Sequence, residues 1–394
     1  MELKKYKLGE LLELQRGYDL PSTEMVEGNV AVVGSNGIIG HHNVGRGNNP
    51  CITIGRSGSV GKVHYYEQPT WAHNTSLFVK DFKGNDPKYL YYFLKNLHLD
   101  ELFGKSSSVI PSLDRKVVHN MVAPFHKDLT TQRKIASILS ALDCKIALNR
   151  AINRNLEALA KQLYDYWFVQ FDFPNEEGKP YKSSGGSMVK DSRTNRLLPE
   201  NWNVKTISEI ECDIITGKTP STSDEANFGG EIPFITIDDI RKAPFIYVTE
   251  RTLTEKGANS QSNKFLPEGS LCCSCIGTTG IIGFVGKRGQ TNQQINTIVF
   301  EDDINKEFLY FSLNLYFQFA KAKTGNILPN MNKEEFSNIL VVYPSKDILQ
   351  RFHTIASELF SQINNNVIEL NTLTKQRNEL LPLLMNGQVS LNSD

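Results

Sequence analysis

The chain is 394 residues long, with 40% hydrophobic and 22% charged residues, a composition that is typical of folded globular proteins and argues against disordered and membrane proteins. Lys and Arg together number 43, as do Asp and Glu, so the overall charge gives no sign of a nucleic-acid partner. The length predicts two or three domains, and we find no long apolar run or signal-peptide core, which predicts a cytoplasmic location.

The first elements along the chain belong to an internal repeat. Residues 54–78 align with residues 276–300 at a constant offset of 222, with nine identities in twenty-five positions. Shorter matches continue the repeat on both sides: PST at 21–23 with PST at 220–222, LYYFL at 90–94 with LYFSL at 309–313, and VIPSL at 109–113 with ILPNM at 327–331. Such a repeat predicts two copies of one globular plan.

Within each copy, short runs of β-branched and aromatic residues alternate with Gly-rich turns, which favours an α+β domain. Such runs are CITI at 51–54, VHYY at 63–66 and TIVF at 297–300. The turn GRSGSVGK at 55–62 has the composition of a phosphate-binding loop, but its glycine spacing is one residue too long and a strand is expected to follow it. We interpret it as a tight β-turn, with a DNA-facing turn as the alternative.

Each copy is followed by a long segment with helical periodicity. Apolar residues there recur mostly at alternating steps of three and four residues, which predicts two coiled-coil helices. The predicted seam residues are Ile135, Ile138, Leu142, Ile152, Leu156, Leu159 and Leu163 in the first helix, and Leu359, Ile363, Leu370, Leu373, Leu380 and Leu384 in the second. Polar residues on the same stripes, which lower stability but fix the register, are Lys145, Asn149, Asn366 and Arg377.

Several stretches resemble the DNA specificity subunits of type I restriction-modification systems. They are IIGHHN at 38–43, ITIGRSGSVGKVHYY at 52–66, the helical segment at 132–174, PYKSSGGSMV at 180–189, NWNVKTISEI and TGKTPST in the second copy, and LLPLLMNG near the end. The resemblance implies an α+β chain with two tandem, β-rich α/β target-recognition domains, separated by two long helices that pair as an antiparallel coiled coil.

On this resemblance the chain divides into five parts. These are a first target-recognition domain at 1–128, a central helix at 129–173, a linker at 174–198, a second target-recognition domain at 199–345 and a C-terminal helix at 346–394. The Gly, Ser, Lys and Pro content of the linker agrees with its place between the copies. The resemblance implies that each domain reads half of a bipartite, asymmetric DNA target and that the helices set the spacing.

The resemblance also implies a non-catalytic chain that serves host defence in the prokaryotic cytoplasm, at the nucleoid. Its expected partners are double-stranded DNA, two methyltransferase subunits per chain and restriction subunits that act as translocase and nuclease, without a membrane. S-adenosylmethionine, ATP and magnesium would belong to those subunits and not to this chain.

Candidate DNA-binding residues are polar side chains on predicted loops, where base-reading and phosphate-binding groups are expected. In the first domain they are Ser35, Asn36, Arg56, Ser57, Lys105, Ser106, Ser107, Ser108 and Arg115. In the second domain they are Lys218, Thr219, Asp238, Asp239, Thr278, Thr279, Gln293, Gln294, Lys323, Asn326 and Lys333. Positions that differ between the copies, such as Arg56 against Thr278 at the offset of 222, are favoured over positions that agree, because the two domains should read different bases.

Other kinds of site are disfavoured. The histidines show no metal-binding spacing, and Cys272 with Cys275 forms a lone CxxC that we interpret as buried thiols. An adenine methyltransferase motif is absent, since Asp86-Pro87-Lys88-Tyr89 has lysine where the motif needs a second proline. Two alternatives stay open: an enzyme with its own specificity domains, and a coiled-coil scaffold whose domains bind protein.

Overall fold

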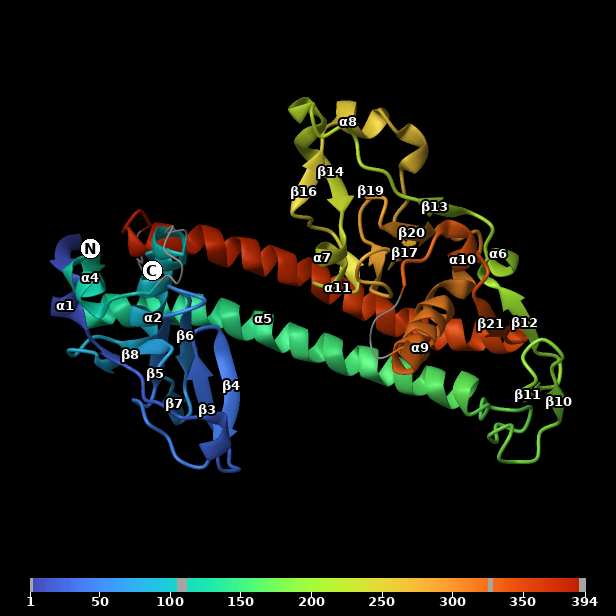
Figure 1. Ribbon diagram of the computed structural model, residues 1–394, viewed down its shortest axis with the longest axis horizontal. Coiled ribbons are helices and arrows are strands. Elements are labelled where there is room, and N and C mark those ends of the chain that lie inside the picture. Colours follow the sequence, from blue (N-terminus) through green and yellow to red (C-terminus); the bar gives the residue numbers. More distant parts are fainter. Residues whose placement is uncertain (1–2, 105–111, 325–328, 390–394) are drawn as a thin grey trace, which may run out of the picture. The chain divides into compact units, whose positions relative to one another are not determined.

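The computed structural model shows two compact units built on two long helices (Figure 1). The described residues are 3–104, 112–324 and 329–389. Unit 1 comprises residues 1–147 and 372–394, and unit 2 comprises residues 148–371. Each unit contains one globular domain and parts of the helices α5 (Leu129–Tyr164) and α11 (Lys346–Met385).

The domain of unit 1 is built on a four-stranded antiparallel sheet in the order β2-β8-β5-β6. A three-stranded sheet, β4-β3-β7, holds β3 and β7 parallel, and β1 pairs with β9. The strands are β1 (Leu3–Lys7), β2 (Glu13–Arg16), β3 (Val30–Gly34), β4 (Gly37–His42), β5 (Cys51–Gly55), β6 (Val63–Tyr66), β7 (Thr70–Ala72), β8 (Ser76–Asp81) and β9 (Val122–His126). The helices are α1 (Leu8–Leu11), α2 (Pro87–Asn96), α3 (Leu99–Phe103) and α4 (Arg115–Asn120).

Helix α2 forms one wall of the core of unit 1. It starts at Pro87, a residue suited to the first helical turn, after Asp86, whose carboxylate accepts a hydrogen bond of 2.8 Å from the Tyr89 amide. Tyr89 and Phe93 lie on its buried face and belong to the same hydrophobic cluster as Ile52 of β5. Burial of these rings ties the helix to the sheet.

The domain of unit 2 repeats this plan with additions. Its main sheet has the order β13-β20-β17-β18-β15, and a second sheet, β16-β14-β19, holds β14 and β19 parallel. The strands are β10 (Met188–Lys190), β11 (Leu197–Pro199), β12 (Asn203–Thr206), β13 (Ile214–Thr216), β14 (Phe228–Ile235), β15 (Phe245–Ile246), β16 (Arg251–Leu253), β17 (Leu271–Ser274), β18 (Ile282–Val285), β19 (Gln290–Thr291), β20 (Ile295–Ile298) and β21 (Leu340–Tyr343). The helices are α6 (Ile207–Ile210), α7 (Ile237–Ile240), α8 (Glu255–Asn259), α9 (Lys306–Thr324) and α10 (Lys333–Ser337).

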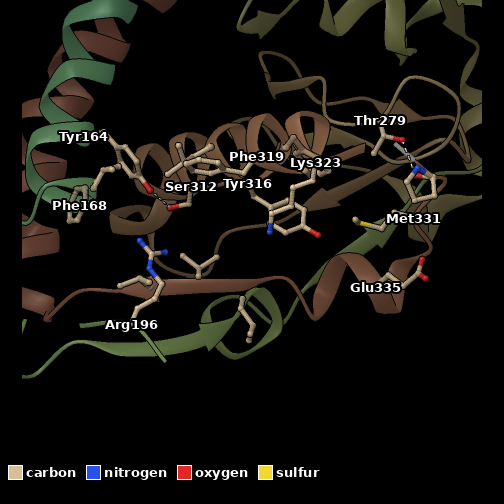
Figure 2. Close-up of a pocket in the computed structure, with 18 of the residues that line it drawn as sticks. Tyr164, Phe168, Arg196, Thr279, Ser312, Tyr316, Phe319, Lys323, Met331 and Glu335 are labelled. Atoms are coloured by element: carbon tan, nitrogen blue, oxygen red, sulfur yellow. Dashed lines mark hydrogen bonds between the residues drawn. The ribbon is translucent and has the colours of Figure 1, made fainter. Parts of the chain in front are cut away.

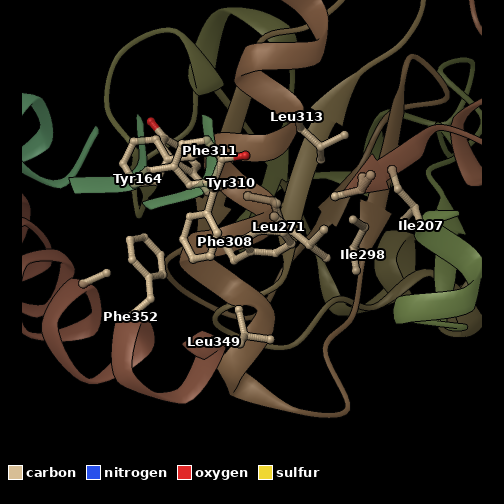
Figure 3. Close-up of a cluster of buried hydrophobic side chains, with 14 of the residues drawn as sticks. Tyr164, Ile207, Leu271, Ile298, Phe308, Tyr310, Phe311, Leu313, Leu349 and Phe352 are labelled. Carbon is tan, nitrogen blue, oxygen red and sulfur yellow. The ribbon is translucent and has the colours of Figure 1, made fainter. Parts of the chain in front are cut away.

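The core of unit 2 is rich in aromatic side chains from α9 (Figure 3). Phe308 packs edge-on against Phe168 with ring centroids 5.0 Å apart, and Phe168 packs in the same way against Phe352 of α11 at 4.9 Å. Leu271 and Ile298 face this cluster from the main sheet. The core therefore joins the sheet, α9 and both long helices of this unit into one packed body.

The two domains share one order of strands, which confirms the predicted α+β class and duplication. Strands β2-β8-β5-β6 correspond to β13-β20-β17-β18, and the parallel pair β3 and β7 corresponds to β14 and β19. The pair β1 and β9 corresponds to β12 and β21, and in each domain a single helical turn follows the first strand of that pair.

In each unit, the two long helices run antiparallel and are joined by polar as well as apolar contacts. In unit 2, Asn149 donates to Glu369 at 2.7 Å, and Asn153 accepts from Asn366 at 2.8 Å. Further along this unit, the ring of Tyr164 at the end of α5 lies 6.2 Å from that of Phe352 on α11. Because the residue numbers rise on α5 as they fall on α11, the pairing is antiparallel.

The same direction holds in unit 1. Arg377 of α11 donates to Asp143 of α5 at 2.9 Å, and the hydroxyl of Tyr92 on α2 donates to the other oxygen of Asp143 at 2.7 Å. Nearer the end of α11, the Leu384 carbonyl lies 3.2 Å from Nε2 of His126. No helix in the described part of the chain has an apolar stretch long enough to cross a membrane.

The structure corrects the predicted seam of α5 by one residue at alternate positions. Ile138, Ile152 and Leu159 are exposed, and the buried positions lie next to them along the chain: Leu139, Asn153 and Ala160. The predicted residues Leu142, Leu156 and Leu163 are half-buried, and Ile135 is buried. A seam whose residues are spaced alternately by three and four fits the helical periodicity equally well if the order of the two steps is reversed. The prediction chose the order that places large aliphatic residues in the seam, whereas the structure buries Asn153 and Ala160 there.

On α11 the predicted stripe is incomplete. Ile363, Leu373 and Leu384 are buried, while Leu359, Leu370 and Leu380 are half-buried. Phe360 and Val367 are buried and were not in the prediction. Of the polar residues predicted on the stripes, Lys145 is exposed.

Residues 174–198, predicted as a linker, fold locally. The Tyr181 ring stacks on Phe173 at 4.6 Å, and the Asp172 carboxylate accepts from both the amide and the hydroxyl of Ser183. Strands β10 and β11 then form a short antiparallel pair in which Leu198 is buried. A Gly- and Ser-rich composition predicts turns correctly but does not exclude packing when an aromatic residue is present.

The displaced seam can be tested with two adjacent residues. Ala160 is fully buried, whereas Leu159 is 52% exposed. We expect Ala160→Gln to lower the free energy of unfolding by about 1 to 3 kcal/mol, because it overfills the seam and buries an amide. Leu159→Gln should change it by no more than about 0.5 kcal/mol. Denaturant unfolding of both variants measures this, and equal losses would contradict the seam described here.

A pH-dependent ion pair ties α9 to α11. The Nδ1 atom of His353 lies 2.7 Å from a Glu307 carboxylate oxygen, and this hydrogen bond raises the pKa of His353 against an opposing effect of burial. Since the pKa is raised in the folded state, the stabilisation is full below the unfolded pKa of about 6.5 and is lost as the pH rises through the folded value.

We therefore expect His353→Gln to lower the melting temperature more at pH 6 than at pH 8.5. The control is His98→Gln, because His98 forms only an exposed pair with Glu101, which contributes little. Thermal unfolding across this pH range measures both. A loss in His353→Gln that is independent of pH would show that the ring acts through packing alone.

Candidate nucleic-acid interface

The turn that joins β5 to β6 has the same backbone as the turn that joins β17 to β18. Gly58 and Gly61 both have φ of +81°, and Gly277 and Gly280 both have φ of +82°. Only glycine adopts this conformation without strain. The two turns are therefore one structural feature, GxxG, present once in each domain.

This equivalence corrects the register of the repeat. Ile54 pairs with Val63 across the first hairpin as Cys273 pairs with Ile282 across the second, which gives an offset of 219 and not 222. Glycines recur every three residues in both copies, so the offset of 222 aligns three pairs of glycines, whereas the structural offset of 219 aligns two. The sequence comparison chose the wrong slip, and in the structure Arg56 corresponds to Cys275 and not to Thr278.

In the first domain, three loops meet at the GxxG turn. The amide of Arg56 donates to the Thr75 carbonyl at 2.8 Å, and the carbonyl of Arg56 accepts from the Leu113 amide at 2.8 Å. The loop after β3 lies on the other side, where Asn36 accepts a hydrogen bond from Lys62 at 2.8 Å. These contacts bring the candidate residues Asn36 and Arg56 into one region.

A groove of ≈ 790 Å³ lies beside this turn and is lined mainly by polar side chains. Arg56 and Arg115, both predicted as DNA-binding, line it together with Arg16, which the prediction omitted. Ser57 lies close by, since it forms a backbone bridge with Ser112 of the groove. The signal that could have found Arg16 is its place at the end of a strand, directly before a glycine.

In the second domain, the corresponding loops are joined by hydrogen bonds. Thr219 donates to Gln293 at 2.6 Å, and the Gln294 carbonyl accepts from the Cys275 amide at 2.7 Å. The Gly277 amide donates to the side chain of Asn330 at 3.0 Å. Asn330 was not predicted, and it extends the polar surface formed by Thr219, Gln293 and Thr278, the last of which is exposed.

Candidates in the two domains occupy equivalent positions. Val33 pairs with Ala72 in the first domain as Ile235 pairs with Thr291 in the second, so the segments carrying Asn36 and Asp238 start at equivalent places, although the first is a tight turn into β4 and the second is helix α7. Arg115 and Lys333 each start the short helix that follows the loop at Leu113 or Met331. The Tyr18 and Lys218 amides donate to the carbonyls of Ala72 and Thr291, which makes these two residues equivalent as well.

Comparison with known proteins also shows the duplication. A family model described as the type I restriction modification DNA specificity domain matches residues 1–158 and again residues 199–380. The chain belongs to this family.

Relatives in the same family match most of the chain. It is 33% identical over 312 residues to the type I restriction enzyme HindI specificity subunit of Haemophilus influenzae, covering 66% of this chain and 68% of that protein. It is 26% identical over 310 residues to the MjaIX specificity subunit of Methanocaldococcus jannaschii, covering 77% and 69%. The S subunit of a type I restriction-modification system from M. genitalium has the same fold, with a TM-score of 0.63 at 16% identity over 98% of this chain and 96% of that one.

Specificity subunits are the non-catalytic, DNA-recognising part of type I restriction-modification systems, and this chain has that role. Membership implies DNA, methyltransferase subunits and restriction subunits as partners. The loops described above are the candidate DNA-reading surface of each domain.

Two residues that the sequence analysis predicted to bind DNA, Asp239 and Thr279, are buried in the structure. Asp239 is buried, and its carboxylate accepts hydrogen bonds from Thr236, Lys242 and the Glu250 amide. Burial raises the pKa of Asp239, but these hydrogen bonds outweigh it and hold the pKa below its ordinary value. Thr279 is also buried, at the position that Val60 fills in the first domain, so both residues serve the fold.

Lys323 lines a cavity that borders the loop surface at Asn330. This apolar cavity of ≈ 650 Å³ lies between α9 and the strand β21 and is also lined by Tyr316, Phe319 and Met331 (Figure 2). The remaining candidates Lys105, Ser106, Ser107, Ser108 and Asn326 lie outside the described residues.

Cysteines and acidic residues do not form a metal site in the part of the chain that the structure describes. Cys272, Cys273 and Cys275 are free and buried, and burial raises the pKa of the Cys272 thiol to about 12. Their burial indicates that these thiols contribute to packing.

The GxxG turns can be tested through their glycines. A Cβ on Gly61 would lie 2.3 Å from the Asp100 amide nitrogen, whereas one on Gly84, which also has positive φ, would meet no atom within 4 Å. We expect Gly84→Ala to cost about 1 to 2 kcal/mol of stability, through backbone strain. Gly61→Ala should cost about 2 to 5 kcal/mol, because the clash with backbone adds to the strain. Denaturant unfolding measures both, and equal costs would argue against a tightly packed turn.

Proposed function

We propose that the chain reads a bipartite, asymmetric DNA sequence, one half with each domain. The observation that carries the proposal is that both domains present the same loops with different side chains. Arg56 stands where the second domain has Cys275, and Tyr18 where it has Lys218. The shared backbone of the GxxG turns gives both domains one way to approach a DNA groove, while unequal side chains select different bases.

The paired helices act as the ruler between the half-sites in this proposal. Helix α5 has 36 residues and extends about 54 Å at 1.5 Å per residue. Half-sites on one face of DNA lie about 34 to 36 Å apart, so helices of this length are sufficient to separate two reading domains by a helical turn of DNA. Polar seam contacts such as Asn149 with Glu369 support a fixed length, because they fit in one register only.

We also infer that the chain recruits the other subunits of the complex, with two methyltransferase subunits per chain, one for each half of the duplication. S-adenosylmethionine, ATP and magnesium would be held by those partners, and the complex would work at the nucleoid. The duplicated plan supports a count of two, since each half offers an equivalent surface.

The test is base-modification sequencing of DNA from a host that carries the chain with its own methyltransferase. We expect one split motif with different half-sites. A variant with seven residues inserted into α5 after Asn149 and seven into α11 beside Glu369 keeps the seam in phase and lengthens it by about 10.5 Å. It should retain both half-sites and lengthen the spacer by up to about three base pairs.

The matched control inserts the same seven residues after Gly185, an exposed glycine with no atom within 4 Å of its Cβ position. This insertion should leave the spacer unchanged. A continuous motif in the wild type would refute the split target. A split motif whose spacer keeps its wild-type length in the helix-insertion variant would refute only the proposal that the helices set the spacing.

A further inference from the structure

The groove of the first domain contains three arginines. Arg16, Arg56 and Arg115 line it, and none forms an ion pair with a residue that the structure describes. Asp19 and Asp114 also line the groove, and Asp114 is occupied by the Lys116 amide, which it caps at 2.8 Å. The positive charge therefore exceeds the negative charge in this groove of a chain that is neutral overall.

Arg56 differs from the other two arginines in how it is held. Its amide and its carbonyl are both hydrogen-bonded, to Thr75 and Leu113, so its backbone is fixed on two sides. Its side chain is half-buried, whereas Arg16 and Arg115 are exposed. An arginine that is fixed in this way, and that forms no ion pair with a described residue, gains most from a ligand that offers two acceptors in the plane of its guanidinium.

The second domain lacks this group at the equivalent place. Cys275, which corresponds to Arg56, is buried, and Thr216 stands where the first domain has Arg16. Its loops offer amides and hydroxyls, such as Gln293 and Thr219, instead of a guanidinium fork. The chemistry of the groove is thus specific to the first domain.

Among DNA groups, two acceptors in one plane are presented by the O6 and N7 atoms of guanine in the major groove, which arginine contacts in a bidentate manner. Phosphates also attract arginine, but an exposed side chain on the rim suffices for them. The fixed backbone of Arg56 suits base reading, and the exposed Arg16 and Arg115 suit phosphates.

We propose that Arg56 reads a guanine in the half-site of the first domain and that Arg16 and Arg115 bind phosphates beside it. The inference rests on the proposed function, because it assigns one base class to one half of the split target. It predicts an asymmetry between the half-sites: one G·C pair depends on the Arg56 fork, and no pair in the other half-site does.

The experiment compares the wild type with Arg56→Ala, Arg56→Lys, Arg16→Ala and Lys80→Ala, each expressed with the methyltransferase partner. Base-modification sequencing gives the motif, and binding of the complex to duplexes with single base-pair changes gives the preference at each position. Lys80 is the matched control, since it is a cation of the same domain that pairs with Glu13 at 3.1 Å outside the groove.

In Arg56→Ala, the preference for guanine at one position should fall on the order of 10- to 100-fold, with the other half-site unchanged. Arg56→Lys should keep the charge but lose most of that preference, because a lysine has no planar fork. Arg16→Ala should weaken binding to all sequences alike and reduce the salt dependence by about one phosphate contact. Lys80→Ala should retain the wild-type motif.

Uniform weakening in Arg56→Ala with an intact motif would overturn the base assignment and make Arg56 a phosphate contact. An unchanged motif and affinity would overturn any role in binding. Failure of the proposed function looks different, because the wild type would then show no split motif at all. Thermal unfolding of each variant separates these outcomes from loss of the fold, and Arg56→Lys provides the second test if Arg56→Ala is unstable.

Discussion

The pairing of α5 with α11 depends on polar side chains that are buried in the seam and that find partners in only one register. Asn153 and Asn366 bond each other, and Asn149 bonds Glu369. A shift of one helix along the other would leave such groups buried without partners, at a cost of about 1 to 3 kcal/mol each. Apolar contacts alone would tolerate such a shift more easily, so the polar residues give up some stability in exchange for a defined length.

The duplicated domains separate what the fold requires from what recognition requires. Gly61 and Gly280 adopt the same positive φ, and Val60 and Thr279 fill the same buried place beside them. These positions are constrained by packing and cannot vary freely. Other positions on equivalent loops are free to differ, and there Tyr18 of one domain corresponds to Lys218 of the other. The contrast explains how one backbone can serve two recognition tasks.

Much of this architecture could be predicted from the sequence. The repeat, the α+β class and the two long helices are all visible as patterns in the chain. The register of the repeat and the register of the α5 seam could not be predicted. Glycines recur every three residues in both copies, so the repeat slipped by three, and apolar residues occupy neighbouring positions on α5, so Leu159 was preferred to Ala160. On α5 the sequence offers two nearly equal alignments, and for the repeat it favours the wrong one, with nine identities at an offset of 222 against two at 219. Hydrogen-bond partners and close packing decide both cases.

The sequence analysis identified the loops of the candidate site more successfully than the individual residues on them. Loops with polar residues were identified, but a carboxylate such as Asp239 reads the same in sequence whether it faces a ligand or caps a buried turn. The Thr236-x-x-Asp239 spacing is in fact that of a capping box, which is a local signal for the structural role. Asn330 and Arg16 were missed because their position beside the GxxG turn comes from long-range pairing of strands.

The neutral charge of the chain bears on how such a subunit can hold DNA. Affinity for DNA comes largely from cations that release counterions from phosphates, and proteins that depend on it are usually basic. With 43 basic and 43 acidic residues, this chain can supply only local contacts, such as those from the arginine groove of the first domain. We propose that partner subunits supply most of the sequence-independent affinity. That division has a physical advantage: a reading surface with little nonspecific affinity of its own discriminates between sequences more sharply, because a mismatch is not masked by strong phosphate binding.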